Sequence, residues 1–278
     1  MTSAAGDKTF EGSIPELYDT LMVPLIFEPY AQDIAQRLRG RALSSVLEIA
    51  AGTGVVTRAL ARTLAPDVRI VATDLNAAMI ARAAEVGTAR PVEWRTADAA
   101  ELPFADGTFD AVVCQFGAMF FPDKPAAFAQ MRRVLRPGGV LLFNVWDRIE
   151  DNAFADTVTQ ALAAIFPADP PRFMARTPHG YHDKDTIARD VAAGGFGAPT
   201  HVETVTAQSR ARTPKVPAVA YCQGTPLRNE IIARDPGGLE AATAQATDAL
   251  ARRYGAGSIE GKIQAHVVVV ERDRAPAG

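Results

Sequence analysis

The stretch Glu48-Ile-Ala-Ala-Gly-Thr-Gly54 follows the apolar pair Val46-Leu47 and places two alanines and two glycines after an expected buried strand. Small residues there let a ligand approach the backbone, since ligands of parallel sheets bind beyond the carboxyl ends of the strands. Backbone N–H groups at the start of the following helix are available to an anionic group. The stretch therefore predicts that Ala51, Gly52 and Gly54 lie against a ligand.

Apolar strands and helices alternate from about residue 43 to residue 146. We expect strands at 44–50, 68–73, 92–96, 109–115 and 140–146, and helices at 55–64, 77–86 and 124–135. Near-continuous apolar runs separated by helices are typical of a parallel sheet covered on both faces. Helical segments at 14–38 and 213–255 and strands at 202–208 and 264–270 are expected outside this core.

An acidic residue follows the second expected strand. Asp74 comes 20 residues after Gly54, where a carboxylate can accept hydrogen bonds from ribose hydroxyls. A dinucleotide fingerprint would have a third glycine where this chain has Thr57. Asp98, after the third strand, either contacts an adenine amino group or caps a helix. A G-x-G turn alone is also compatible with mere close packing, but together these features indicate a nucleoside ligand.

The composition excludes several classes of protein. The 278 residues suit one α/β domain with insertions or two smaller domains, and a net charge of −3 gives no reason to expect a nucleic-acid partner. The longest apolar runs are too short to cross a bilayer, and the N-terminal sequence lacks the pattern of a secretory signal. Cys114 and Cys222 have no metal-ligand spacing, so we predict no metal site. A cytoplasmic protein is expected.

Four ordered motifs carry a family resemblance, namely LEIAAGTG, ATDLNAAMI, RTADAAELPFADGTFDAVVCQFGAMFF and RRVLRPGGVLLFNVW. Together they resemble the class I S-adenosylmethionine-dependent methyltransferases, particularly the small-molecule group similar to the quinone-biosynthesis C-methyltransferases. The resemblance runs from residue 46 to residue 146 and is weak beyond Asp147. Leu17-Tyr18-Asp19 also resembles the tyrosine-aspartate pair that precedes the core in such enzymes.

The resemblance implies a Rossmann-like, doubly wound, seven-stranded, mostly parallel sheet with an antiparallel last strand, plus helical cap insertions. On this basis we divide the chain into five parts. These are an N-terminal helical segment covering the cofactor site (1–40), the S-adenosylmethionine-binding core (41–147), a variable acceptor and cap region with a late core strand (148–260), the final strand (261–272) and a mobile tail (273–278).

The resemblance also assigns the cofactor site residue by residue. The turn around the methionine portion would be formed by Glu48, Ala50, Gly52 and Gly54, and Tyr18 would cover it. Asp74 would bind the ribose, and Leu75 would lie beside the adenine, whose edge Asp98 and Ala99 would contact. Gln115 and Phe116 would line the sulfonium side. Met79 either packs on the adenine or belongs to the helix core. The product would be S-adenosylhomocysteine.

The catalytic chemistry is harder to assign, because a sulfonium methyl group is already activated and mainly needs alignment with its nucleophile. A base is required only when the acceptor must lose a proton, and His182 is our candidate. We expect an apolar or aromatic small molecule as acceptor; the acceptor atom and the oligomeric state stay open. The alternatives are a nicotinamide-dependent oxidoreductase and a non-catalytic protein that binds the adenosyl cofactor.

Overall fold

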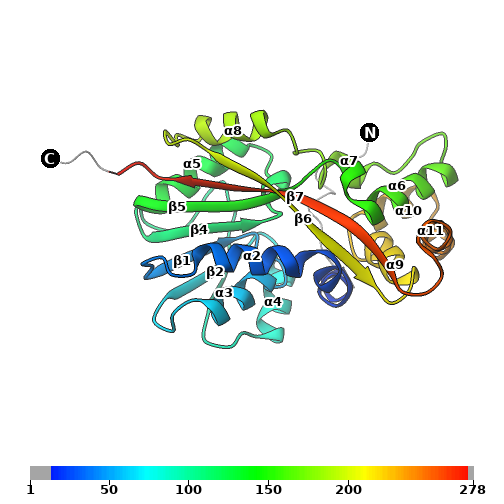
Figure 1. The fold of residues 1–278 in the computed structure, drawn as a ribbon, viewed down its shortest axis with the longest axis horizontal. Coiled ribbons are helices and arrows are strands. Elements are labelled where there is room, and N and C mark those ends of the chain that lie inside the picture. The colour runs from blue at the N-terminus through cyan, green and yellow to red at the C-terminus, as the bar shows by residue number, and fades with distance from the viewer. Residues whose placement is uncertain (1–13, 275–278) are drawn as a thin grey trace. The chain divides into compact units, whose positions relative to one another are not determined.

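The computed structural model describes residues 14–274, and its strands form one seven-stranded sheet (Figure 1). The strand order is β3-β2-β1-β4-β5-β7-β6. The strands are β1 Ser45–Ile49, β2 Arg69–Asp74, β3 Glu93–Thr96, β4 Phe109–Gln115, β5 Leu135–Trp146, β6 His201–Ala211 and β7 Ile259–Glu271. The order reverses between β1 and β4, so the topological switch point lies where these two strands end.

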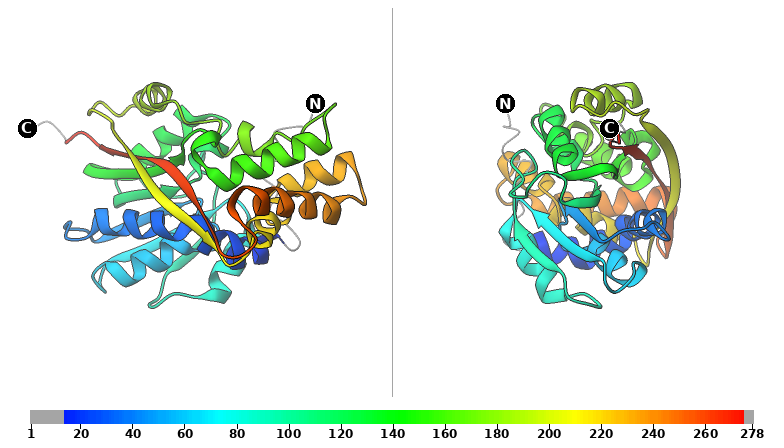
Figure 2. Two further views of the ribbon diagram at one scale, coloured as in Figure 1. Left: turned by 45° about the vertical axis from the view of Figure 1, so that its right-hand side comes forward. Right: turned by 90° about the vertical axis from the view of Figure 1, so that its left-hand side faces the viewer.

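Strands β1 to β5 run in parallel, and β7 runs antiparallel to both of its neighbours, β5 and β6. β1 pairs in parallel with β2 and β4, while β3 and β5 extend the sheet on either side. β7 runs against β5, because Asp147 N donates to Gln264 O whereas Arg272 N donates to Gly139 O. The arrows of β6 and β7 point in opposite directions in Figure 1, and Figure 2 shows the two strands side by side. The predicted sheet with its antiparallel last strand is confirmed.

Helices connect and follow these strands. They are α1 Ile14–Leu17, α2 Glu28–Leu38, α3 Val55–Thr63, α4 Ala77–Val86, α5 Lys124–Val134, α6 Ala153–Ile165, α7 Phe173–Arg176, α8 Lys184–Ala193, α9 Lys215–Gln223, α10 Leu227–Arg234 and α11 Leu239–Tyr254, with a π-helical segment, Tyr18–Phe27, between α1 and α2. Helical residues are thus confirmed across most of 14–38 and 213–255. Within the described residues 14–274, no helix is both long and apolar enough to span a bilayer.

One strand begins earlier than the sequence predicts. We expected the fifth strand to start at residue 140, but β5 starts at Leu135, because Leu135 pairs with Phe109 while Val140 pairs with Ala111. The residues between these two pairs form an irregular bulge, in which a Cβ on Gly139 would lie 2.9 Å from the Asp110 carbonyl oxygen. Proline and glycine signals therefore mark a bulge here and not the boundary of the strand. The predicted tail at 273–278 lies mostly outside the described residues.

The chain divides into two compact units, which we describe separately. The core unit holds residues 29–145, 182–205 and 266–274, and the helical unit holds residues 14–28, 146–181 and 206–265. In the core unit, α3 packs Val56 and Leu60 against a cluster that includes Val46, Ile70 and Val113 of the sheet. Each such side chain, when fully buried, contributes about 1.5–3 kcal/mol. This packing fixes α3 behind the turn that leaves β1.

The helical unit is built around α6, α9 and α11, since α11 packs against both other helices. Phe154 on α6 meets Tyr254 on α11 edge to face, with ring centroids 5.2 Å apart. A second anchor is Glu230 on α10, whose buried carboxylate accepts the Arg172 N–H at 2.7 Å and pairs with Arg176 at 2.9 Å. Glu230 therefore ties the start of α7 to α10.

We predict that Glu230→Ala destabilises the protein by about 3 kcal/mol, because it removes the acceptor of the Arg172 and Phe173 N–H groups and the ion-pair partner of Arg176. Glu230→Gln keeps an acceptor oxygen and should cost less. The free energy of unfolding, measured by urea denaturation, tests this order. The control is Glu240→Ala on exposed α11 surface, expected within about 0.5 kcal/mol of the unchanged protein. Equal losses for Glu230→Ala and Glu240→Ala would contradict the prediction.

Candidate cofactor site

The chain leaves β1 in an unusual backbone conformation. Ala50, Gly52 and Gly54 all have positive φ angles, of 54°, 55° and 84°. Hydrogen bonds hold this turn, since the Ala51 N–H donates to the Thr73 carbonyl on β2 and the Gly54 N–H donates to the Ala51 carbonyl, both at 2.9 Å. The left-handed region is strained for residues with a Cβ and common at functional sites. The turn thus carries the backbone sharply into α3.

Gly54 is confined by side chains from two other elements. A Cβ at this position would lie 2.9 Å from Cη2 of Trp94 on β3 and 3.2 Å from the Cβ of Ala83 on α4. Glycine is required here for its φ angle and for the close approach of Trp94. The second glycine of the G-x-G pattern is therefore a structural requirement of the turn, whatever it also does for a ligand.

Asp74 ends β2 and is tied to the glycine turn. Its Oδ2 accepts the Gly52 N–H and its Oδ1 accepts the Asn76 N–H, both at 2.8 Å. Burial raises the pKa of the Asp74 carboxyl, while the hydrogen bonds from Asn76 and Gly52 oppose this effect. Leu75, directly after it, is 49% exposed, an unusual position for a large apolar side chain. The strand therefore ends in a carboxylate followed by an exposed apolar side chain, and their roles toward a ribose and an adenine stay predictions.

The residues assigned to the adenine lie in three environments. Asp98 is exposed, and its Oδ1 accepts the Ala100 N–H at 2.8 Å in a turn. No helix starts there, so the helix-cap alternative for Asp98 is wrong. Ala99 is buried beside it, and Met79 is buried in α4. Burial of Met79 is compatible with both of its interpretations, and its contact with adenine stays a prediction.

A second strained turn follows β4, next to the end of β1. Phe116 has φ 51°, and its N–H donates to the backbone and side-chain oxygens of Asn144 on β5 at 3.1 and 3.0 Å. A Cβ on Gly117 would lie 2.5 Å from the Cβ of Ala50. Two left-handed non-glycine residues thus end neighbouring strands at the switch point. Gln115, buried at the end of β4, belongs to the same group.

Glu48 lies on β1, where only Ile49 separates it from the glycine turn, and its side chain points into the core. It is 1% exposed, and Thr57 Oγ1 donates to its Oε2 at 2.5 Å. Burial is the main cause that raises the pKa of Glu48 to about 8; the Thr57 hydrogen bond and Arg58 oppose it, and Asp74 adds to it. A carboxyl of this kind changes its ionisation near neutral pH.

Several residues of this site escaped the sequence analysis. Asn144 fixes the β4 turn, Asn76 orients Asp74, and Trp94 and Arg58 enclose the glycine turn, with Arg58 Nη1 donating to the Thr53 carbonyl at 2.6 Å. Asn144 did carry a signal, since an amide inside the apolar run GVLLFNVW is buried only with partners. The others carried none, because their contacts depend on how distant elements fold together.

Tyr18, assigned as a cover for the cofactor, belongs to the helical unit. Its ring stacks on Phe27 with centroids 5.1 Å apart, and Phe27 lies 6.1 Å from Trp146. The described contacts therefore place Tyr18 in an aromatic row within that unit. Its role toward the cofactor stays a prediction.

The stretch His179-Gly-Tyr-His182 contains two histidines with different surroundings. His179 is buried in the helical unit, where its Nδ1 lies 2.8 Å from the Asp147 carbonyl and its ring 6.0 Å from that of Trp146. His182 precedes Asp183, whose side chain caps α8 by accepting the Thr186 N–H. His182 therefore lies in a segment that leads into α8, and a catalytic role for His182 stays a prediction.

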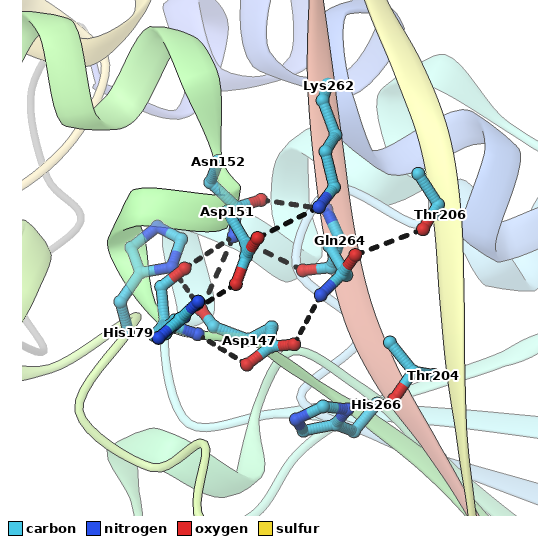
Figure 3. A network of polar contacts seen from close by, with 10 residues as sticks. Asp147, Asp151, Asn152, His179, Thr204, Thr206, Lys262, Gln264 and His266 are labelled. Carbon is cyan, nitrogen blue, oxygen red and sulfur yellow. Dashed lines mark hydrogen bonds and ion pairs between the residues drawn. The ribbon is translucent and has the colours of Figure 1, made fainter.

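Figure 3 shows the polar network around His179 in the helical unit. The Gln264 side chain lies between two partners, donating to Asp147 Oδ2 at 2.6 Å and accepting from Thr206 Oγ1 at 3.1 Å. Asn152 completes the network by accepting the Gln264 N–H at 3.1 Å. These bonds join the residue after β5 to β7 and β6, so the network braces the strands.

Metal ligands do not gather in the described part of the chain. Within residues 14–274, no group of three or more histidine, cysteine or acidic side chains could hold a metal ion. Cys114 is buried beneath the β4 turn, and burial raises the pKa of its thiol to about 12. This thiol is therefore protonated and unreactive at neutral pH.

The geometry defines a Rossmann-like nucleotide-binding protein, with a glycine turn after β1 and a carboxylate at the end of β2. The family model described as "Methyltransferase domain" matches residues 47–143. A ubiquinone/menaquinone biosynthesis C-methyltransferase UbiE from a Marinomonas species is 31% identical over 169 residues, covering 56% of this chain and 67% of that protein. The chain belongs to the class I S-adenosylmethionine-dependent methyltransferases, in the quinone-biosynthesis-like group.

Two further comparisons set the extent of the likeness. The UbiE protein of Saccharophagus degradans is 34% identical over 167 residues, and the match covers 54% of this chain but only 66% of the relative, slightly less than two thirds of its length. The solved structure of Haemonchus contortus phosphoethanolamine N-methyltransferase 2 with S-adenosyl-L-methionine has a TM-score of 0.58 at 17% identity, covering 94% of this chain and 56% of that chain. At this identity the likeness shows the fold alone. The nicotinamide-dependent alternative finds no support in these comparisons.

Proposed function

We propose that this protein transfers the methyl group of S-adenosylmethionine to a small molecule by in-line displacement. The observation that carries the proposal is the bond between the Gly52 N–H and Asp74, which joins the glycine turn and the strand-end carboxylate into one site. In the proposed complex, Asp74 binds the ribose hydroxyls and Leu75 packs beside the adenine. Gln115 and Phe116 line the reactive end, with Asp98 and Ala99 at the adenine edge.

The bound cofactor supplies an activated methyl group, since it leaves as a neutral thioether. The work left to the protein is to hold the acceptor in line and to exclude water. The strained turns at Ala50 and Phe116 support this proposal, because fixed backbone at neighbouring strand ends gives a pre-organised site. A base is needed only for an acceptor that must lose a proton, and His182 remains our candidate.

For the acceptor we propose an apolar or aromatic metabolite, recognised by residues outside the 41–147 core. The region 148–260 is rich in apolar side chains, of which Phe173 and Met174 are buried and Ile165 is 37% exposed, and acceptor sites are mostly apolar. A net charge of −3 favours such a molecule over a nucleic acid, and a cytoplasmic location is part of the same proposal.

The test compares ligands and then turnover. Isothermal titration calorimetry should show binding of S-adenosylhomocysteine and none of NAD. Labelled S-adenosylmethionine, incubated with the protein and a metabolite extract, should then yield a labelled small molecule that is missing when the protein is heat-inactivated. Binding of NAD alone would favour the oxidoreductase. Cofactor binding without transfer to any metabolite would indicate a non-catalytic binder.

A further inference from the structure

Glu48 is a buried carboxylic acid whose described hydrogen-bond partner, Thr57, carries no charge. Its side chain leaves the middle strand of the sheet and is 1% exposed, and the hydrogen bond from Thr57 Oγ1 occupies only Oε2. The Thr57 hydroxyl favours the ionised carboxylate, but this single bond does not offset the effect of burial, which is the larger cause. Glu48 therefore differs from Asp74, which accepts two backbone N–H groups that favour its charged form.

The charged and titratable groups around Glu48 come from three elements. Arg58 on α3 favours the ionised form, while Asp74 at the end of β2 disfavours it. Cys114 on β4 is the third, and its thiol is neutral at physiological pH. With burial as the largest cause, the pKa of Glu48 rises to about 8, so the carboxyl is mostly protonated in the free protein at neutral pH.

A ligand that brings positive charge to the glycine turn would favour the ionised form of Glu48 and so lower its pKa. The methionine end of S-adenosylhomocysteine carries an ammonium group, and S-adenosylmethionine adds a sulfonium. A nearby positive charge favours the ionised carboxyl, particularly where burial weakens solvent screening. Linkage is reciprocal, so a ligand that promotes ionisation must itself bind more tightly to the ionised protein.

Building on the proposed function, we propose that cofactor binding is coupled to release of the Glu48 proton, so that cofactor affinity depends on pH. The ionised protein is the competent form, and the affinity therefore rises with pH. With a pKa of about 8, about 3% of the free protein is ionised at pH 6.5 and about half at pH 8. The apparent dissociation constant should accordingly fall about 15-fold between these two pH values.

Calorimetry can count the protons directly. S-adenosylhomocysteine is titrated into the full-length protein at pH 7 in phosphate and in Tris, two buffers with different ionisation enthalpies. The difference in apparent binding enthalpy should correspond to release of about nine-tenths of a proton per ligand, given a pKa of about 8. The affinity is then measured from pH 6.5 to pH 8.

Two variants assign the proton to its residue. Glu48→Gln keeps an acceptor for Thr57 but cannot ionise, so its titration should release almost no proton and its affinity should be flat across the pH range. Glu93→Gln, on β3, is the matched control, because ion pairs with Arg69 and Arg95 lower the pKa of Glu93 and keep it ionised throughout. It should release as much proton as the unchanged protein.

The outcomes separate this inference from the proposed function. Binding to the unchanged protein without proton release overturns the coupling alone, even if Glu48→Gln fails to fold. Full release by a folded Glu48→Gln variant also overturns it, because another group must then supply the proton. No binding of S-adenosylhomocysteine to the unchanged protein would remove the proposed function and the coupling together.

Discussion

Replacing Asp74 with alanine should weaken S-adenosylhomocysteine binding about 100-fold. In the proposed site its carboxylate accepts hydrogen bonds from the ribose hydroxyls, and bonds to a charged group contribute about 1.5–3 kcal/mol each. Asp74 also accepts the Gly52 and Asn76 N–H groups, so its removal loosens the turn that the methionine portion would contact. Calorimetric titration at pH 8 measures the loss.

Two further variants separate binding from folding in this experiment. Asp74→Asn retains one acceptor oxygen and should lose less affinity than Asp74→Ala. Asp67→Ala removes an exposed carboxylate just before β2 and should bind as tightly as the unchanged protein. Far-ultraviolet circular dichroism checks that each variant is folded. A folded Asp74→Ala protein with undiminished affinity would contradict the assignment of the ribose site.

The elements of the core unit were predictable because each has a strong local pattern. Helix 77–86 and strand 109–115 match α4 and β4 residue for residue. The buried run of β1 and the small residues after it also predicted the position of the turn. These features depend on the spacing of apolar residues and on the positions of glycines, and both can be recognised within a few residues of sequence.

The details of the site depend instead on residues far apart in sequence. The φ angle of Phe116 is held by Asn144, 28 residues later, and Trp94 closes on Gly54 from another strand. Nothing local to Phe116 signals a left-handed conformation, which is rare for bulky residues. The ionisation of Glu48 likewise depends on burial and on Asp74, which appear only when β1 and β2 pair. The sequence therefore predicts where a cofactor site would lie but not the electrostatics of its residues.

Replacing Gly54 with alanine should destabilise the protein by roughly 2–5 kcal/mol and weaken S-adenosylhomocysteine binding at least about tenfold. Alanine in the left-handed region costs about 1–2 kcal/mol, and overpacking against half-buried Trp94 and buried Ala83 adds about 1–3 kcal/mol. The new methyl group would meet Trp94 at 2.9 Å, so either the indole or the turn must shift. A shifted turn no longer presents Gly52 and Asp74 in their present geometry. Urea denaturation and calorimetric titration measure the two effects.

Gly40 provides the matched control for this substitution. It has φ 77°, close to the value for Gly54, but a Cβ there would have no neighbour within 4 Å. Gly40→Ala therefore includes the cost of the positive φ without the clash, and we expect a loss of about 1 kcal/mol and unchanged ligand affinity. The difference between the two variants isolates the contact with Trp94. Equal losses in both would mean that the indole moves aside at no cost, and the predicted effect of the Trp94 contact on stability and binding would be wrong.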